Sequence, residues 1–320
     1  MSTYFNEEIT KTVNNLKEDK YDLCFALLSD SKLSDEGVLT RENIAEVDKK
    51  ANFDFIVHCG NYILGNNPEK ISRRLMTDEM KDYQDSIKSG KIFVCQGEND
   101  GWRNERFKGQ LAYNIVCDET WYEDTSFLNT YVVRNGNSPY YYSDFEDKKV
   151  RVICLCSYVY ELDNENEMFE KLTTLGVKQT VWLDKEALNV PVGWTVLIFS
   201  HRAPNSRFET GQDPFIYKGR STEKTLAVLQ QAQKRGVNIA AWIFGGYGAD
   251  GHFNIGGINY ISVPYQCLNS SAINKCGLEE VKRQKDTLTQ ECWNVFSLNT
   301  DERILRLIRF GAGEDRVIKY

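Results

Sequence analysis

The stretch Tyr21-Asp-Leu-Cys-Phe-Ala-Leu-Leu-Ser-Asp-Ser31 decides the fold, because it joins a short apolar run to an abrupt polar end. Such a run is typical of a buried strand that stops at a loop. The pattern recurs at Phe53–Cys59 before Gly60-Asn61, Lys91–Cys95 before Gly97-Glu98-Asn99-Asp100, Val150–Cys156, Trp194–Phe199 before Ser200-His201, and Val237–Phe244 before Gly245-Gly246. Helices fit at 68–89, 178–188 and 222–235. This alternation predicts an α/β fold with parallel strands, whose ligand sites gather at the strands' carboxyl ends.

One main domain accounts for the length and composition. A chain of 320 residues with 41% hydrophobic residues can bury a large core, which fits one elaborated α/β domain. We expect residues 1–20 to form an N-terminal helix or extension and residues 21–320 to form that domain. The C-terminal part, from 257 to 309, has the pattern of successive antiparallel strands. The strands and helices together predict two sheets flanked by helices.

An aromatic-rich insertion at about 101–149 is the least regular part of the chain, and it contains Tyr140-Tyr141-Tyr142 directly after Pro139. Exposed tyrosines would suit a protein partner or a cell-surface glycan, because they combine apolar area with a polar tip. The alternative, which the sequence favours, is a β-hairpin that packs on the edge of a sheet.

Charge and hydropathy exclude several classes of partner. The net charge is −7 at pH 7, whereas a nucleic-acid backbone is bound mainly by clustered Lys and Arg side chains. We therefore expect no nucleic-acid partner. No stretch approaches the roughly 20 apolar residues that a membrane span needs. The polar N-terminus also lacks the apolar region of a secretory signal. We therefore expect a protein that is made in the cytoplasm.

Five strand-end loops, taken in order, resemble the motif series of the calcineurin-like metallophosphoesterases: D-x-H, G-D, G-N-H-D/E, a lone H, and G-H-x-H. The loops here read Asp30-Ser31-Lys32, Gly60-Asn61, Gly97-Glu98-Asn99-Asp100, His201, and Gly245-Gly246-Tyr247-Gly248. The chain also resembles a branch of that family found in Gram-positive bacteria and their phages, notably at Cys154-Leu-Cys156, Gln179–Leu188 and Arg309–Arg316. The resemblance covers roughly residues 20–320 and implies a two-sheet αββα sandwich.

The resemblance implies a two-metal centre that polarises a phosphate and makes a hydroxide from bound water, but most of its ligands are missing here. One metal position would fall to Asp30, Lys32, Asn61 and Gly248, and the other to Asn61, Glu98, His201 and Gly246. The acid that protonates the leaving group would be Asn99, which cannot do acid–base work near neutral pH. The pattern uses five histidines, whereas this chain has three: His58, His201 and His252.

Lys32 stands where the family has a metal-binding imidazole, and its ammonium would repel a divalent cation. We expect it to neutralise Asp30 and Glu98 through a hydrogen-bonded ion pair; the alternative is a lysine that points into solvent. Asp250 sits where this branch often carries an acid after the last glycine loop. If a metal binds, we expect one Mn, Fe or Zn ion held by Asp30, Glu98 and His201, with Asp250 as a further ligand.

These losses predict a catalytically inactive phosphoesterase-like protein with a binding or structural role and no metal cofactor. The branch resemblance extends the prediction to a phage tail or baseplate component, hence an oligomer or assembly subunit in a phage or phage-like particle. The alternative is a metal-dependent phosphoesterase with a reworked, mononuclear site. Ligands are lost at four loops together, including the shared bridging carboxylate, which favours the first prediction.

Overall fold

The computed structural model describes residues 3–17, 20–103, 113–115, 118–162, 169–173, 175–203, 221–268 and 281–320. Its first half contains α1 (Thr3–Lys17), β1 (Leu23–Leu28), α2 (Asp35–Ala51), β2 (Phe55–His58), α3 (Glu69–Asp85), β3 (Ile92–Val94), β4 (Gly101–Arg103), β5 (Tyr113–Ile115), α4 (Asp118–Asp124), β6 (Val133–Arg134) and β7 (Tyr141–Phe145).

The second half continues with β8 (Val150–Cys154), β9 (Tyr158–Leu162), β10 (Phe169–Thr173), α5 (Gly176–Trp182) and a π-helical turn at Leu183–Ala187. Beyond these come β11 (Thr195–Ser200), α6 (Ser221–Lys234), β12 (Asn238–Gly248), β13 (Gly251–Ile255), β14 (Ile258–Pro264), β15 (Cys292–Asn299), β16 (Ile304–Gly311) and β17 (Arg316–Lys319). Each helix in the described part of the chain is too short or too polar to cross a membrane.

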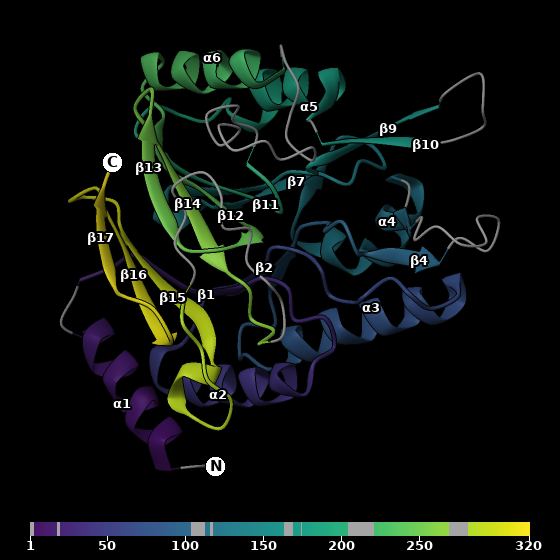
Figure 1. The fold of residues 1–320 in the computed structure, drawn as a ribbon. Coiled ribbons are helices and arrows are strands. Elements are labelled where there is room, and N and C mark those ends of the chain that lie inside the picture. The colour runs from purple at the N-terminus through teal and green to yellow at the C-terminus, as the bar shows by residue number, and fades with distance from the viewer. Residues whose placement is uncertain are drawn as a thin grey trace.

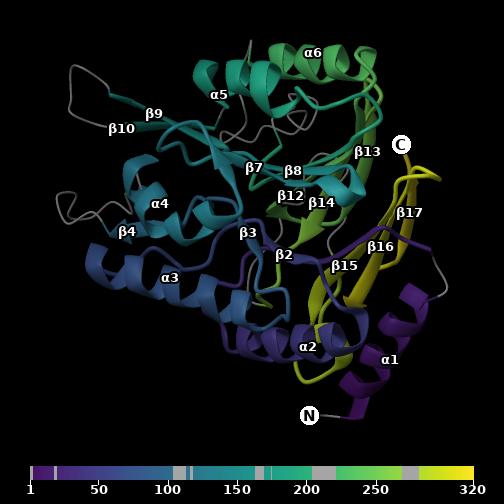
Figure 2. The same ribbon diagram turned by 180° about the vertical axis from the view of Figure 1, so that it is seen from behind.

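Two large mixed sheets face each other in the described part of the chain. The first has the order β17-β16-β15-β1-β2-β3, and the second has the order β13-β14-β12-β11-β8-β7-β6. Figures 1 and 2 show α1, α2 and α3 along the outer face of the first sheet, and α5 and α6 along that of the second. This arrangement confirms the predicted αββα sandwich.

Apolar strands buried on both faces hold the sheets together. All six side chains of β1 are buried, as parallel strands covered on both sides require. Phe25 stacks on Phe55 and Phe296 within the first sheet, and its ring meets Phe199 of the second sheet edge-on at 5.7 Å. The apolar side of α1 is buried in the same core, through Phe5, Ile9, Val13 and Leu16.

The predicted series of antiparallel strands after residue 257 is only partly right. β15 and β16 do pair antiparallel in the first sheet, but β14 pairs parallel with β12 in the second. All seven side chains of β14 are buried, because it lies inside a sheet that helices cover. The chain therefore crosses between the two sheets after residue 264.

The exposed tyrosine platform at residues 140–142, which the sequence favoured less than a packed hairpin, does not form. β7 lies between β6 and β8, within the second sheet. The Tyr141 side chain is fully buried, and its hydroxyl donates to the Val94 carbonyl at 2.9 Å. The Tyr140 ring packs 4.7 Å from Trp182, and the half-buried Tyr142 ring lies 3.8 Å from the Arg151 guanidinium. The tyrosines therefore pack against neighbouring side chains in the antiparallel β6–β7 hairpin, next to the edge of the sheet, as the hairpin alternative predicted.

Candidate functional site

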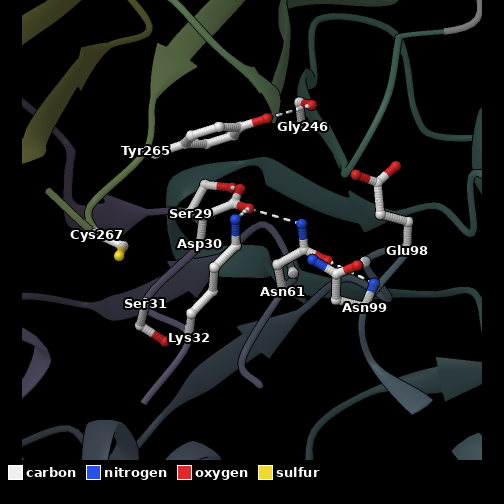
Figure 3. A network of polar contacts seen from close by, with 12 residues as sticks. Ser29, Asp30, Ser31, Lys32, Asn61, Glu98, Asn99, Gly246, Tyr265 and Cys267 are labelled. Carbon is white, nitrogen blue, oxygen red and sulfur yellow. Dashed lines mark hydrogen bonds and ion pairs between the residues drawn. The ribbon is translucent and has the colours of Figure 1, made fainter. Parts of the chain in front are cut away.

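Loops from both sheets meet at the carboxyl ends of β1, β2 and β11. Asp30 follows β1, Asn61 follows β2 and His201 follows β11. Asn61 Nδ2 donates to Asp30 Oδ1 at 2.6 Å and lies 3.4 Å from His201 Nε2. Figure 3 shows Asn61 facing Asp30 from the neighbouring loop. The topology thus brings together three residues that are far apart in the sequence.

Left-handed backbone at non-glycine residues is concentrated in these loops. The φ angles are +60° at Asp30, +50° at Lys32, +52° at Leu33 and +59° at Asn61. Two hydrogen bonds between the loops hold this conformation: Asp30 N–H donates to Gly60 O at 2.9 Å, and Lys32 N–H donates to Asn61 O at 3.1 Å. Such strain persists only where surrounding contacts fix it, and it clusters at functional sites.

The orientation of the Asn61 amide is fixed by its neighbours. Asn61 Oδ1 accepts the backbone N–H of Asn99 at 2.8 Å, and a carbonyl oxygen is the atom that can accept there. The Nδ2 hydrogens must therefore face Asp30 and His201. Asn61 Nδ2 is a donor at the place where the resemblance implies a carboxylate shared by two metals.

Asp30 is surrounded by protein donors. Besides Asn61, it accepts the Ser29 hydroxyl at 2.7 Å and lies 3.3 Å from Lys32 Nζ. Burial raises its pKa to about 6, although the Lys32 charge and the hydrogen bonds from Ser29 and Asn61 oppose the rise. The Lys32 side chain is 14% exposed, and its ammonium lies 4.8 Å from the centre of the Tyr265 ring. The predicted ion pair with Asp30 is present, and the solvent-facing alternative is wrong.

The tautomer of His201 follows from its partners. His201 Nδ1 lies 2.7 Å from the Cys59 carbonyl oxygen, which can only accept, so Nδ1 carries the proton. In the neutral ring Nε2 is then the unprotonated nitrogen, and it faces Asn61 Nδ2. The ring is fully buried. Its basic nitrogen therefore points into the site.

Glu98 forms an ion pair with Arg202, a residue that the sequence analysis did not single out. Arg202 Nη2 donates to Glu98 Oε2 at 2.7 Å, and the guanidinium lies 4.7 Å from the centre of the Tyr247 ring. Arg202 is buried, and its position directly after His201 was the only signal in the sequence. Together with Lys32 and Asp30, this pair gives two cations against two carboxylates.

Gly246 and Gly248, which the sequence placed in a loop but which end β12, have no space for the histidines of the family pattern. A Cβ at Gly246 would lie 2.6 Å from His201 Nε2, and one at Gly248 would lie 2.3 Å from the Tyr265 ring. Gly248 also has a φ of +68°, which a side chain rarely adopts. The Tyr265 hydroxyl donates to Gly246 O at 3.0 Å. The Tyr265 ring, which the sequence analysis missed, thus occupies the place beside Gly248.

Asp250, the further ligand expected if a metal binds, is held by two arginines in this structure. Arg316 donates to both of its carboxylate oxygens at 3.0 Å, and Arg309 Nη2 lies 3.0 Å from Oδ1. The Arg309 side chain is fully buried. The two arginines come from the C-terminal strands β16 and β17, so Asp250 ties these strands to the β12–β13 turn.

Asp100 fixes the loop after β3 to the loop after β2. Its carboxylate accepts the backbone N–H groups of Gly97, Asn61 and Tyr62 at 2.7, 2.9 and 2.7 Å. Burial raises the pKa of Asp100 to about 7, against these hydrogen bonds. Asp100 therefore positions the backbone of Asn61, a role that the motif comparison did not predict.

The other two histidines lie away from the donors around Asp30. His58 Nδ1 accepts the Gly60 N–H at 3.1 Å, so Nε2 donates to Ser31 Oγ at 3.0 Å, and burial lowers the pKa of the ring. His252 lies in β13, with Nε2 3.1 Å from Asn259 Oδ1. His58, within β2, is a fully buried core residue.

The donors at this site do not fit a two-metal centre. Asn61 presents N–H groups, Lys32 presents an ammonium, and both glycines lack side chains. Transition metals need several imidazole or carboxylate ligands in fixed geometry. Within the described ranges, no group of three or more His, Cys, Asp or Glu side chains is arranged to hold a metal ion.

Comparisons with known proteins agree with the two-sheet fold. The family model described as calcineurin-like phosphoesterase matches residues 35–246. A dimetal phosphatase from Danio rerio superposes with a TM-score of 0.60 at 16% identity, over 94% of this chain and 100% of that one. GAP50, the anchor in the inner membrane complex of Plasmodium, superposes with a TM-score of 0.52 at 12% identity, over 94% and 89%. At these identities the likeness shows the fold alone.

One curated protein shares a local match with the chain. The dUMP-forming dCTP deaminase of Methanocaldococcus jannaschii is 33% identical over 79 residues. The match covers 25% of this chain and 37% of that protein, so the chain spans little more than a third of its length.

Proposed function

The chain belongs to the calcineurin-like phosphoesterase family, and we propose that it is a member in which protein groups have taken the place of the metal ions. In this proposal the protein binds a partner or has a structural role, and it does not hydrolyse phosphate esters. The phosphoesterase-like fold supplies the scaffold, and the residues at the strand ends decide how it is used.

The observation that carries the proposal is the set of donors around Asp30. Its Oδ1 lies 2.6 Å from the Asn61 amide nitrogen and 3.3 Å from the Lys32 ammonium. A metal ion bound to this oxygen would have to displace both groups and would face the ammonium charge. Asp30 is thus neutralised from within the protein, as Glu98 is by Arg202.

The fold itself is compatible with both catalysis and assembly. One similar structure is a dimetal phosphatase, and another is an anchor in the inner membrane complex of Plasmodium. The Plasmodium anchor supports the proposal that a chain with this fold can have a role in an assembly. The narrower proposal, a phage tail or baseplate component, is supported by the branch resemblance alone.

One observation favours a mononuclear enzyme as the second candidate. His201 Nε2 is the unprotonated ring nitrogen and faces Asn61 in the site, and an unprotonated imidazole nitrogen is what a metal ion binds. However, Asn61 Nδ2 lies 3.4 Å from this nitrogen, and Glu98 is held by Arg202. For Glu98 to bind such a metal through Oε2, its pair with Arg202 would have to break.

Hydrolysis of an aryl phosphate with added Mn²⁺, Fe²⁺ or Zn²⁺ separates the two candidates. The matched control is His201→Ala, which removes the imidazole that a mononuclear centre needs. We expect wild type and His201→Ala to give the same rate as buffer with metal. A metal-dependent rate in the wild type that His201→Ala abolishes would refute the proposal and establish the enzyme.

A further inference from the structure

The side chains of Lys32 and Asn61 meet at one oxygen atom of a buried carboxyl group. Asp30 Oδ1 lies 2.6 Å from Asn61 Nδ2 and 3.3 Å from Lys32 Nζ. Asp30 and Asn61 are fully buried, and little of the Lys32 side chain is exposed. Figure 3 shows the ends of both side chains turned toward the Asp30 carboxyl group. A primary amine and a carboxamide are thus gathered at one carboxyl group, away from most of the solvent.

The backbone holds Lys32 and Asn61 next to each other. Lys32 N–H donates to Asn61 O at 3.1 Å, which joins the two residues directly although they are far apart in the sequence. Both residues have left-handed backbone, with φ angles of +50° and +59°. Such conformations persist only where surrounding contacts fix them. The lysine and the asparagine are therefore held in one arrangement, which replaces the encounter of two separate reactants.

The Asn61 carboxamide is oriented as an electrophile. Its Oδ1 accepts the backbone N–H of Asn99 at 2.8 Å. Negative charge develops on this oxygen when an amine adds to the carbonyl carbon, and an N–H group that already points at it stabilises that charge. The amide nitrogen, which is the leaving group, lies 2.6 Å from Asp30 Oδ1. A carboxyl group at this distance can protonate the leaving nitrogen.

We propose that Lys32 Nζ and Asn61 Cγ form an intramolecular isopeptide bond, with Asp30 as the acid–base group. Asp30 first takes one proton from the Lys32 ammonium, which gives a neutral acid and a nucleophilic amine. Nζ then attacks Cγ, the new C–N bond forms, and negative charge moves to Oδ1. Asp30 gives its proton to Nδ2 and accepts one from Nζ as the Cγ–Nδ2 bond breaks. One ammonia leaves for each amide formed, and the reaction uses no oxidant, reductant or cofactor.

The bond joins the loop after β1 covalently to the loop after β2. It closes the segment from Lys32 to Asn61, which contains α2 and β2, into a loop. A cross-link of this kind stabilises the folded protein mainly because it restricts the unfolded chain. The proposal concerns a covalent modification, so it does not depend on whether the protein hydrolyses phosphate esters.

Mass spectrometry of the full-length protein tests the proposal. After incubation of the purified protein near neutral pH, we expect a mass that is lower than the sequence mass by one ammonia. Digestion with trypsin should release residues 21–41 joined to residues 51–70, because trypsin does not cleave after the bonded Lys32. A protein without this loss would overturn the proposal. A loss of water, with Lys32 joined to Asp30, would overturn the assignment of Asn61 as its partner.

Variants assign the reacting groups. Lys32→Arg keeps the positive charge but removes the primary amine, and Asp30→Asn removes the acid, so neither variant should lose ammonia. Lys148→Arg is the matched control, because Lys148 also pairs with an aspartate, Asp54, and it should lose ammonia as the wild type does. Loss of ammonia in Lys32→Arg would overturn the proposal, because it would show that an asparagine reacts without this lysine. If Lys32→Arg does not fold, the presence or absence of the joined peptides in the wild type decides.

Discussion

Replacing Asn61 by aspartate is the sharpest perturbation of the candidate site. The change restores the carboxylate that the family uses to bridge two metals. It also removes the N–H group that donates to Asp30 Oδ1 at 2.6 Å and puts an oxygen in its place. The contact to His201 Nε2 loses its donor as well. Two carboxylates would then meet in a fully buried site.

The magnitude follows from this geometry. Two unit charges at 2.6 Å repel each other by about 6 kcal/mol at an effective dielectric constant of about 20. Protonation relieves part of this, because the pKa of Asp30 is already raised to about 6. We expect Asn61→Asp to lower the free energy of unfolding by about 2–4 kcal/mol near neutral pH. The pair binds a proton in the folded state, so the loss shrinks as the pH falls.

Urea denaturation, with and without MnCl₂, provides the assay. Asn66→Asp is the control, because it makes the same chemical change at an exposed position. Mn²⁺ should not restore the stability of Asn61→Asp, because Lys32, Gly246 and Gly248 still provide no metal ligands. A variant as stable as Asn66→Asp without metal would refute the reasoning. So would a saturable recovery of stability with Mn²⁺.

Three further predictions concern single residues of the site. Lys32→Ala should lower the free energy of unfolding by about 1–3 kcal/mol, measured by urea denaturation, because it strips Asp30 of its cation; a change below about 0.5 kcal/mol would contradict the ion pair. Gly248→His should lower Tm strongly in calorimetry, since its Cβ would lie 2.3 Å from the Tyr265 ring, and an unchanged Tm would show that the ring moves aside. Burial raises the pKa of Asp30 and of Asp100 from 3.8 to about 6 and about 7, respectively. Their contribution to stability is therefore complete below about pH 4 and is lost as the pH rises through about 6 and 7. Urea denaturation at several pH values should show that the free energy of unfolding declines less steeply with pH in Asp100→Asn than in the wild type.

The strands and the loops after them could be predicted because the signal is local. An apolar run that ends at polar residues identifies β1, β2, β11 and β12 without any knowledge of the partners. The carboxyl ends of parallel strands then share an edge, which brings Asp30, Asn61 and His201 together. The amide in place of the bridging carboxylate could be read directly from Gly60-Asn61.

The contacts that complete the site are not local and could not be predicted. Arg202 looks like any loop arginine until Glu98 is placed beside it, 104 residues away in the sequence. Tyr265 fills the space beside Gly248 only because the segment after β14 returns to this edge. Asp250 seemed available as a ligand because Arg309 and Arg316, which bind it, lie in strands that the sequence did not place next to it.

The metal content of the purified protein tests the central claim most directly. The wild type and His201→Ala are expressed in medium supplemented with Mn, Fe and Zn and are purified without chelators. Their metal content is then measured by inductively coupled plasma mass spectrometry. The donors around Asp30 predict well under about 0.1 equivalent of each metal in both proteins. About one or two equivalents in the wild type, lost in His201→Ala, would contradict the replacement of metal by Asn61 and Lys32.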